Sequence, residues 1–184
     1  MCCFQYQDDA DRFYRGLINR LGKFSLTITK EKTKIIPFGR FAEQYCRKDG
    51  KSKPATFDFL GFTHYCSRSY QGKFRVKRRT CRKKFRASLK RMKEWVRANR
   101  NLPAKILMDR LSVKLLGYYR YYGVTDNFWK LQEFFYHTKR ALFKWLNRRS
   151  QRKSFNGEKF EKFLNKFPLP EPKIYINIMD VRLP

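Results

Sequence analysis

The sequence predicts an α+β fold in which a mixed first half is followed by an all-helical second half. Before Thr80, short apolar runs alternate with polar residues and are separated by turn-forming residues. From Thr80 onward, apolar residues recur at intervals of three and four, which is typical of amphipathic helices. We therefore expect a first domain over residues 1–79, a helical domain over residues 80–150 and a C-terminal extension over residues 151–184.

The first domain is predicted to contain one amphipathic helix between short strands. The apolar residues 1–6 indicate a strand that begins without a turn or cap, as if the chain started in mid-fold. Asp8 is placed to cap the helix that follows. Residues 26–28 and 35–38 indicate two more short strands, and the polar, basic stretch 39–54 indicates a long loop that is functional or mobile.

A hairpin is expected next. Residues 57–65 are predicted to form one strand and residues 72–77 its partner, with residues 67–71 turning between them. Gly61 interrupts the first strand, and a glycine in a strand often marks a bulge or the close approach of another backbone or a ligand.

Three long helices are predicted for the second domain. The first begins near Thr80, the second has Pro103 in its opening turn and stops at Gly123, and Thr125 is the expected N-cap of the third. The apolar side of the first helix comprises Phe85, Leu89, Met92 and Val96. The packed face of the third is expected to comprise Phe128, Leu131, Phe135, Thr138, Leu142 and Trp145.

The C-terminal extension is predicted to hold a short helix and a last strand. Phe160, Phe163, Leu164 and Phe167 recur at helical spacing. Three alternating prolines, Pro168, Pro170 and Pro172, then hold the chain extended before a strand over residues 174–178.

Charge is the strongest functional signal in the sequence. Lysine and arginine total 44 against 15 aspartates and glutamates, and the net charge of +29 opposes compaction unless a polyanion neutralises it. Hydrophobic residues make up 42% and aromatic residues 17% of the chain, which is too many for a disordered basic tail. A folded nucleic-acid-binding protein is therefore predicted. No apolar run approaches the roughly 20 residues of a membrane span.

Aromatic and basic residues of the second domain are the candidate RNA contacts. Tyr118 and Tyr122 fall on the apolar stripe of their helix and are expected in the core, whereas Tyr119 and Tyr121 project elsewhere and are candidates for stacking on unpaired bases. The candidates for phosphate contacts are Arg120, Lys139, Arg140, Lys144, Arg148 and Arg149.

Catalytic and metal-ligating groupings are not recognised in the sequence. Asp8, Asp9 and Asp11 could hold magnesium in a polymerase-like site, but carboxylates that open a helix more often stabilise its positive end, and the capping role is favoured. His64 and His137 lie far apart in sequence and do not predict a metal site. The five cysteines lack zinc-site spacing and are expected to be reduced thiols, which favours a cytoplasmic location.

Several ordered blocks resemble bacterial group II intron reverse transcriptases over nearly the whole chain. The first set is similar to the later palm motifs of that family and the second set to its thumb, or maturase, domain. The palm-like blocks are Asp8-Asp9-Ala10, Lys23-Phe24, Glu31-Lys32-Thr33-Lys34, Phe38-Gly39-Arg40-Phe41 and Phe59-Leu60-Gly61-Phe62. The thumb-like blocks are residues 115–122, 136–140, 145–150 and 168–178.

The resemblance implies roles for particular residues. Phe59, Leu60, Gly61 and Phe62 would form the primer grip, and Lys32 would be the cation near the incoming nucleotide. Residues 80–149 would be the thumb, which clasps template-primer duplex and intron RNA. The family's catalytic Tyr-Ala-Asp-Asp turn precedes the segment matched by residues 2–6, so no catalytic residue is assigned and no polymerisation is expected from this chain alone. Magnesium is expected only for a complete polymerase.

The resulting hypothesis is a fragment of a reverse transcriptase/maturase that binds group II intron RNA and template-primer and assists splicing in the bacterial cytoplasm, associated with the nucleoid. One alternative is half of a split reverse transcriptase that polymerises only with the N-terminal part as partner. A second is a generic basic RNA-binding protein, and a third is a degenerate fragment that barely folds, because an incomplete palm exposes strand edges.

Overall fold

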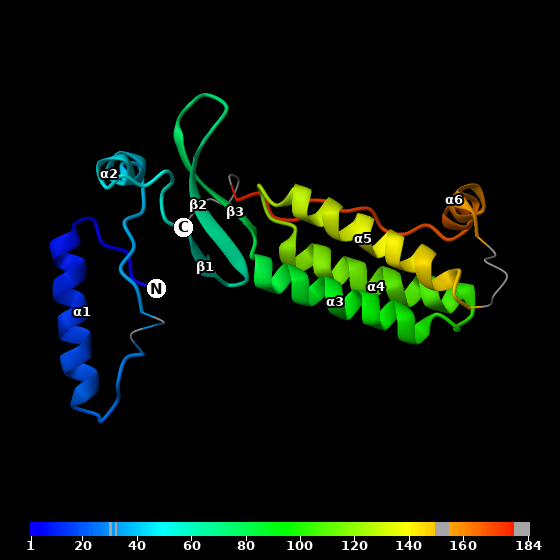
Figure 1. Cartoon of the computed structure of the whole chain (residues 1–184), viewed down its shortest axis with the longest axis horizontal. Helices are drawn as coiled ribbons and strands as arrows, with labels where there is room; N and C mark the ends of the chain where they lie inside the picture. Colours follow the sequence, from blue (N-terminus) through cyan, green and yellow to red (C-terminus); the bar gives the residue numbers. More distant parts are fainter. Residues whose placement is uncertain (30, 32, 150–154, 179–184) are drawn as a thin grey trace. The chain divides into compact units, whose positions relative to one another are not determined.

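The computed structural model describes residues 1–29, 31, 33–149 and 155–178. The described residues form six helices and one three-stranded sheet, so the α+β class is confirmed (Figure 1). They divide into two compact units. The first comprises Met1–Thr56 and Tyr65–Val76, and the second comprises Phe57–His64 and Lys77–Pro184. The boundary between the two units crosses the hairpin expected over residues 57–77. The domain limits expected at residues 79 and 150 stay predictions.

Two helices and the outer part of the hairpin make up the first unit. Helix α1 spans Gln7–Gly22, as expected, but its N-cap is Tyr6, with Asp8 and Asp9 in the first turn, where their charges favour the helix dipole. Helix α2 spans Ala42–Lys48, within the stretch predicted to be a loop. Its buried residues, Ala42 and Cys46, lie four positions apart and form a short apolar side that the basic composition of the stretch concealed.

The strands expected over residues 1–6, 26–28 and 35–38 are absent from the described part of the first unit, and those predictions are wrong. A strand must satisfy its backbone N–H and C=O groups by pairing with a neighbour. An alternating sequence indicates which face would be buried but supplies no partner, and these segments have none within the described sheet.

The sheet has the order β1-β2-β3, with β1 at Phe57–Phe59, β2 at Phe62–Arg68 and β3 at Phe74–Thr80. Residues 57–65 therefore form a tight hairpin instead of the single strand predicted. Phe59 pairs with Phe62, and the two residues between them have φ angles of 48° at Leu60 and 80° at Gly61. Positive φ at both positions is the geometry of a type I′ turn, whose twist matches that of antiparallel strands.

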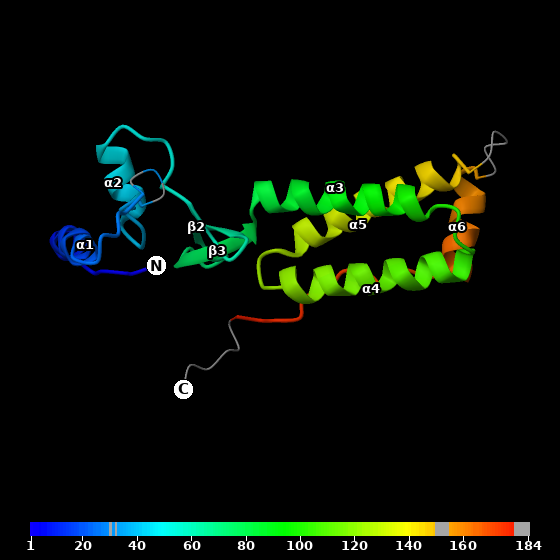
Figure 2. The ribbon, with the colours of Figure 1, turned by 90° about the horizontal axis from the view of Figure 1, so that it is seen from below.

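Four helices carry the core of the second unit: α3 at Arg82–Asn99, α4 at Ala104–Tyr122, α5 at Phe128–Leu146 and α6 at Gly157–Lys166. All four confirm helices predicted from periodicity. Helices α3, α4 and α5 lie side by side in both views (Figures 1 and 2). Their fully buried side chains include Val96, Leu107, Leu111, Leu115, Tyr119, Leu131 and Leu142.

The buried face of α5 differs from the predicted one. Leu131, Thr138 and Leu142 are buried as expected, but Phe134 and Leu146 occupy the core where Phe135 and Trp145 were predicted. The N-cap is Asn127, not Thr125. A periodic pattern with aromatic residues at adjacent positions leaves two registers open, and packing against α3 and α4 decides between them.

The C-terminal segment lies along the α4–α5 turn. The predicted strand over 174–178 is reduced to one parallel bridge between Val124 and Ile176 within the described residues. The N–H groups of Tyr175 and Ile176 donate to Gly123 O at 2.7 and 3.0 Å. A Cβ at Gly123 would lie 2.9 Å from Lys173 O, so this close approach of two backbones requires glycine.

Candidate nucleic-acid interface

The exposed face of α5 combines aromatic rings with positive charges. Trp129 is 75% exposed and Tyr136 is 56% exposed, and Arg140 and Lys144 are also exposed. Because these residues are separated by seven, four and four positions, they lie along one side of the helix. The Arg140 guanidinium lies over the Tyr136 ring, 5.7 Å from its centroid. The face therefore offers rings for bases and cations for phosphates.

Four positive charges within the described part of the chain lie close to the indole of Trp145. Two come from α5 and its C-terminal end, since the Lys144 ammonium and the Arg148 guanidinium lie 5.5 and 5.4 Å from the ring centroid. Two come from the end of α3, since the guanidinium groups of Arg97 and Arg100 lie 5.4 and 5.5 Å away. Each contact with the ring is favourable, but like charges held this close repel one another. A bound phosphate would relieve that repulsion.

Two of the predicted phosphate ligands have partners within the chain. The Lys139 ammonium lies 3.8 Å from the Glu161 carboxylate, on α6. The Arg149 guanidinium donates to Leu102 O at 3.1 Å, and burial lowers the pKa of this group. Arg140, Lys144 and Arg148 are thus the predicted residues that the structure gathers on one surface, whereas Lys139 and Arg149 each have a polar contact with another segment of the chain.

Burial separates the two candidate stacking tyrosines. Tyr121 is exposed, as expected, and Arg120 beside it is exposed too. Tyr119 has an exposed fraction of 0%, so the expectation that it faces outward is wrong. Burial raises the pKa of the Tyr119 phenol above its ordinary value of 10.0. The C-terminal segment lies near this phenol, because Tyr175 and Glu171 both act on it electrostatically, and its apolar residues pack against the same core.

The expected primer-grip residues form the turn of the β1–β2 hairpin. Leu60 and Phe59 are exposed, whereas Phe62 packs against Tyr121 and Tyr122 with ring centroids 6.3 and 5.5 Å apart. The Tyr121 hydroxyl donates to Leu60 O at 3.1 Å. The C-terminal end of α4 therefore supports the hairpin turn directly.

Helix α3 adds further positive charge. It carries eight lysines and arginines and one glutamate, and three of the cations, Arg82, Lys83 and Lys84, stand in its first turn. That turn has no acidic residue and no side-chain cap, so cations face the positive end of the helix dipole. This placement costs stability in the free protein, and an anion bound nearby would reduce the cost.

The remaining candidates contribute less. Lys32 lies outside the described residues. Among the residues that the structure describes, no cluster of three or more His, Cys, Asp or Glu side chains could hold a metal ion, and Asp8, Asp9 and Asp11 form no such cluster. No described helix is both long enough and apolar enough to span a bilayer.

Sequence reasoning missed the exposed rings Trp129 and Tyr136 and the two arginines of α3 near Trp145. The signal for the rings was their absence from the apolar repeat of α5, because a large aromatic residue outside the packed face must be exposed. The approach of Arg97 and Arg100 to Trp145 depends on tertiary packing, and no local pattern marks it.

Comparisons of the chain with protein-family models, curated proteins and solved structures find no match.

Proposed function

We propose that this chain binds RNA through the exposed face of α5 and the basic cluster around Trp145. We further propose that the chain corresponds to the end of the palm and the thumb of a group II intron reverse transcriptase/maturase, whose motifs the sequence resembles. In that role the chain would hold intron RNA for splicing and contribute to template-primer binding.

The observation that carries the proposal is the placement of Trp129 and Tyr136 beside Arg140 and Lys144 on one solvent-facing side of α5. Exposed large rings cost free energy in water unless a partner covers them. Bases stack on such rings, and the phosphates that link the bases reach cations spaced along the same face. An anionic lipid surface would attract the same charge, but the apolar face of α5 is buried in the core and is not available to enter a bilayer interface.

The double variant Arg140→Glu with Lys144→Glu tests the proposal. We expect its affinity for a group II intron RNA to fall about 10- to 100-fold at moderate salt, since two charge-assisted contacts are reversed. Arg12→Glu with Arg20→Glu, two exposed residues of α1, is the matched control, because it changes the net charge equally. Equal losses of affinity in the two variants would mean that the net charge of the chain alone attracts the RNA.

The nature of the RNA is tested with the unmodified chain. Binding that favours folded intron RNA over an unrelated duplex of equal length at 150 mM salt supports the maturase role. Equal affinity for both would instead assign the chain to generic basic RNA-binding proteins.

A further inference from the structure

The first unit contains a basic hollow that belongs to none of the surfaces described above. Its volume is about 840 Å³, within the roughly 300–1,000 Å³ of small-molecule sites. Three segments form its walls: the start of α2 with the residues before it, residues 52–54, and the outer part of the β2–β3 hairpin. All of them belong to the first compact unit.

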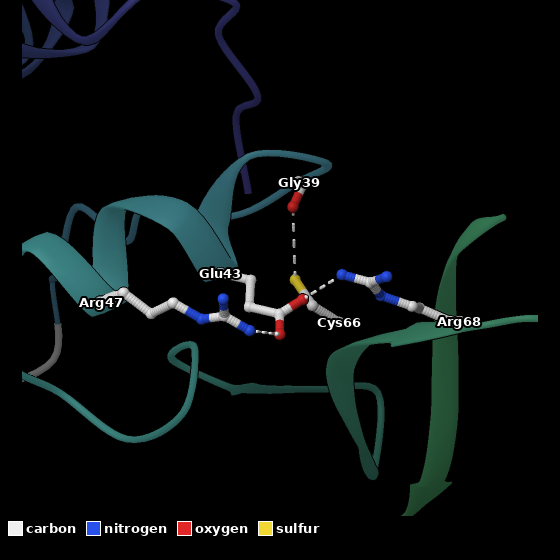
Figure 3. A network of polar contacts seen from close by, with 5 residues as sticks. All are labelled: Gly39, Glu43, Arg47, Cys66 and Arg68. Carbon is white, nitrogen blue, oxygen red and sulfur yellow. Dashed lines mark hydrogen bonds and ion pairs between the residues drawn. The ribbon is translucent and has the colours of Figure 1, made fainter. Parts of the chain in front are cut away.

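One carboxylate joins two of these walls. Glu43 of α2 accepts from Arg68 Nη2 at 2.8 Å and from Arg47 Nη2 at 3.0 Å, so it lies between a strand residue and a residue of its own helix (Figure 3). On the same side, the Cys66 thiol donates to Gly39 O across 3.7 Å. These contacts join the hairpin to α2 at the side of the hollow.

The charge of the lining is strongly positive. Among the residues that the structure describes, Arg40, Lys53, Arg68 and Lys73 line the hollow, against the single carboxylate of Glu43. Glu43 already accepts from two arginines, so it cannot neutralise the other cations. An anionic group entering the hollow would therefore meet several unneutralised positive charges.

Two exposed phenyl rings complete the lining. Phe41 and Phe74 are both solvent-exposed and both line the hollow, at the start of α2 and at the start of β3. Aromatic faces next to cations match the two parts of a nucleotide, because the base stacks on a ring and the phosphate pairs with lysine or arginine. An inorganic anion would use the cations and leave the rings uncovered.

We propose that this hollow binds one nucleotide, with its phosphate among Arg40, Lys53 and Lys73 and its base against Phe41 or Phe74. The nucleotide is either free or part of an unpaired RNA strand. The site lies in the first unit and does not rest on RNA binding by α5.

Alkylation of Cys66 is the local test of this site. Cys66 lines the hollow, and Cys2 and Cys3 are exposed and serve as internal references in the same chain. The full chain is treated with iodoacetamide and the modified peptides are quantified by mass spectrometry, alone and with 5 mM AMP, a five-nucleotide RNA or a hexaglutamate peptide. We expect AMP or the RNA to slow the alkylation of Cys66 at least about fivefold relative to Cys2 and Cys3.

The three probes distinguish the possible sources of the ligand. Protection by AMP assigns a free nucleotide, and protection by the RNA alone assigns a single-stranded segment. An unchanged Cys66 rate with both nucleotide probes overturns the proposal, and so does equal protection by hexaglutamate, which would assign an acidic peptide. Because the experiment measures the alkylation rate of Cys66, a loss of intron RNA binding through α5 would not change its outcome.

A variant then checks the residues named. Arg40→Glu with Lys73→Glu is expected to abolish the protection, while Arg12→Glu with Arg15→Glu on α1 is expected to retain it. Phe41→Leu keeps an apolar side chain but removes the ring, and it is expected to weaken protection at least about threefold. Unchanged protection in both hollow variants would overturn the proposal even if Cys66 is shielded in the unmodified chain.

Discussion

Asn127 and Thr80 form a reciprocal hydrogen-bonded pair in the interior of the second unit. The Thr80 N–H donates to Asn127 Oδ1 at 2.8 Å, and Asn127 Nδ2 donates to Thr80 Oγ1 at 2.8 Å. Asn127 Nδ2 also donates to Tyr122 O at 2.8 Å, and Asn127 is only 1% exposed. One side chain thus joins the end of β3, the end of α4 and the start of α5.

Replacing Asn127 with alanine is expected to destabilise the second unit by about 2–4 kcal/mol. The change removes the partners of a buried backbone N–H and of a buried hydroxyl, and unsatisfied buried groups cost more than the hydrogen bonds themselves contribute. All three tryptophans, Trp95, Trp129 and Trp145, lie in this unit, so urea unfolding followed by tryptophan fluorescence reports on it. Asn101→Ala, at an exposed position, is the control and should change the unfolding free energy by less than about 0.5 kcal/mol.

Local signals predicted the limits of the helices better than their packing. Pro103 and Gly123 bracket α4 as expected, because proline lacks a backbone donor and glycine accepts a close backbone neighbour. The pairing of Asn127 with Thr80 spans 47 positions, and no local pattern marks it. The burial of Tyr119 was missed for the same reason, because the C-terminal segment near its phenol lies more than 45 residues away in sequence.

The candidate site was predicted where its residues lie on one helix and missed where it depends on contacts between helices. Arg140, Lys144 and Arg148 follow each other at intervals of four, so their shared face is determined by the helix alone. Arg97 and Arg100 reach Trp145 only because α3 packs on α5. The hairpin turn was missed because Leu60 adopts a positive φ angle, which leucine rarely does, so Gly61 alone indicated a bulge and not a two-residue turn.

The two residues of that turn should respond to substitution with opposite signs. Gly61→Ala is expected to destabilise the second unit by about 1 kcal/mol, because Gly61 has a φ of 80° and its new Cβ would lie 3.4 Å from the Tyr122 hydroxyl. Leu60→Asn is expected to stabilise it by up to about 1 kcal/mol, because asparagine tolerates positive φ better and Leu60 is exposed. Fluorescence-monitored urea unfolding measures both. Changes of the same sign in the two variants would contradict the type I′ assignment.

His64 is expected to make the stability of the second unit depend on pH below its ordinary pKa of 6.5. Burial, and then the charge of Arg78, lowers the pKa of His64, while Asp58 opposes the shift. Between the folded-state pKa and pH 6.5, the unfolded chain binds a proton at His64 that the folded chain does not. The contribution of His64 to stability is therefore complete above pH 6.5 and is lost as the pH falls toward the folded-state pKa. The slope is at most about 1.4 kcal/mol per pH unit and smaller here, because the half-buried ring is partly screened by water.

The His64 contribution is measured as the difference between the unmodified chain and His64→Gln. We expect the unmodified chain to lose more unfolding free energy between pH 7 and pH 5 than this variant does. His137→Gln is the matched control and should retain the steeper dependence. If the two variants share one pH profile, His64 is not the titrating group responsible.

Ring and charge contacts on α5 should be separable by their salt dependence. Trp129→Ala and Tyr136→Ala are each expected to weaken binding to an unpaired RNA by about 1–3 kcal/mol, because each removes a stacking surface, while the slope of log affinity against log salt stays unchanged. Arg140→Ala is expected to weaken binding and to reduce that slope by about 1, because one phosphate contact is lost. Tyr70→Ala, a fully exposed tyrosine of the first unit, is the aromatic control and should change neither quantity. Fluorescence anisotropy between 50 and 200 mM salt measures both quantities. A slope that falls in the two ring variants would mean that the rings only position neighbouring cations, and stacking would then not be the basis of recognition.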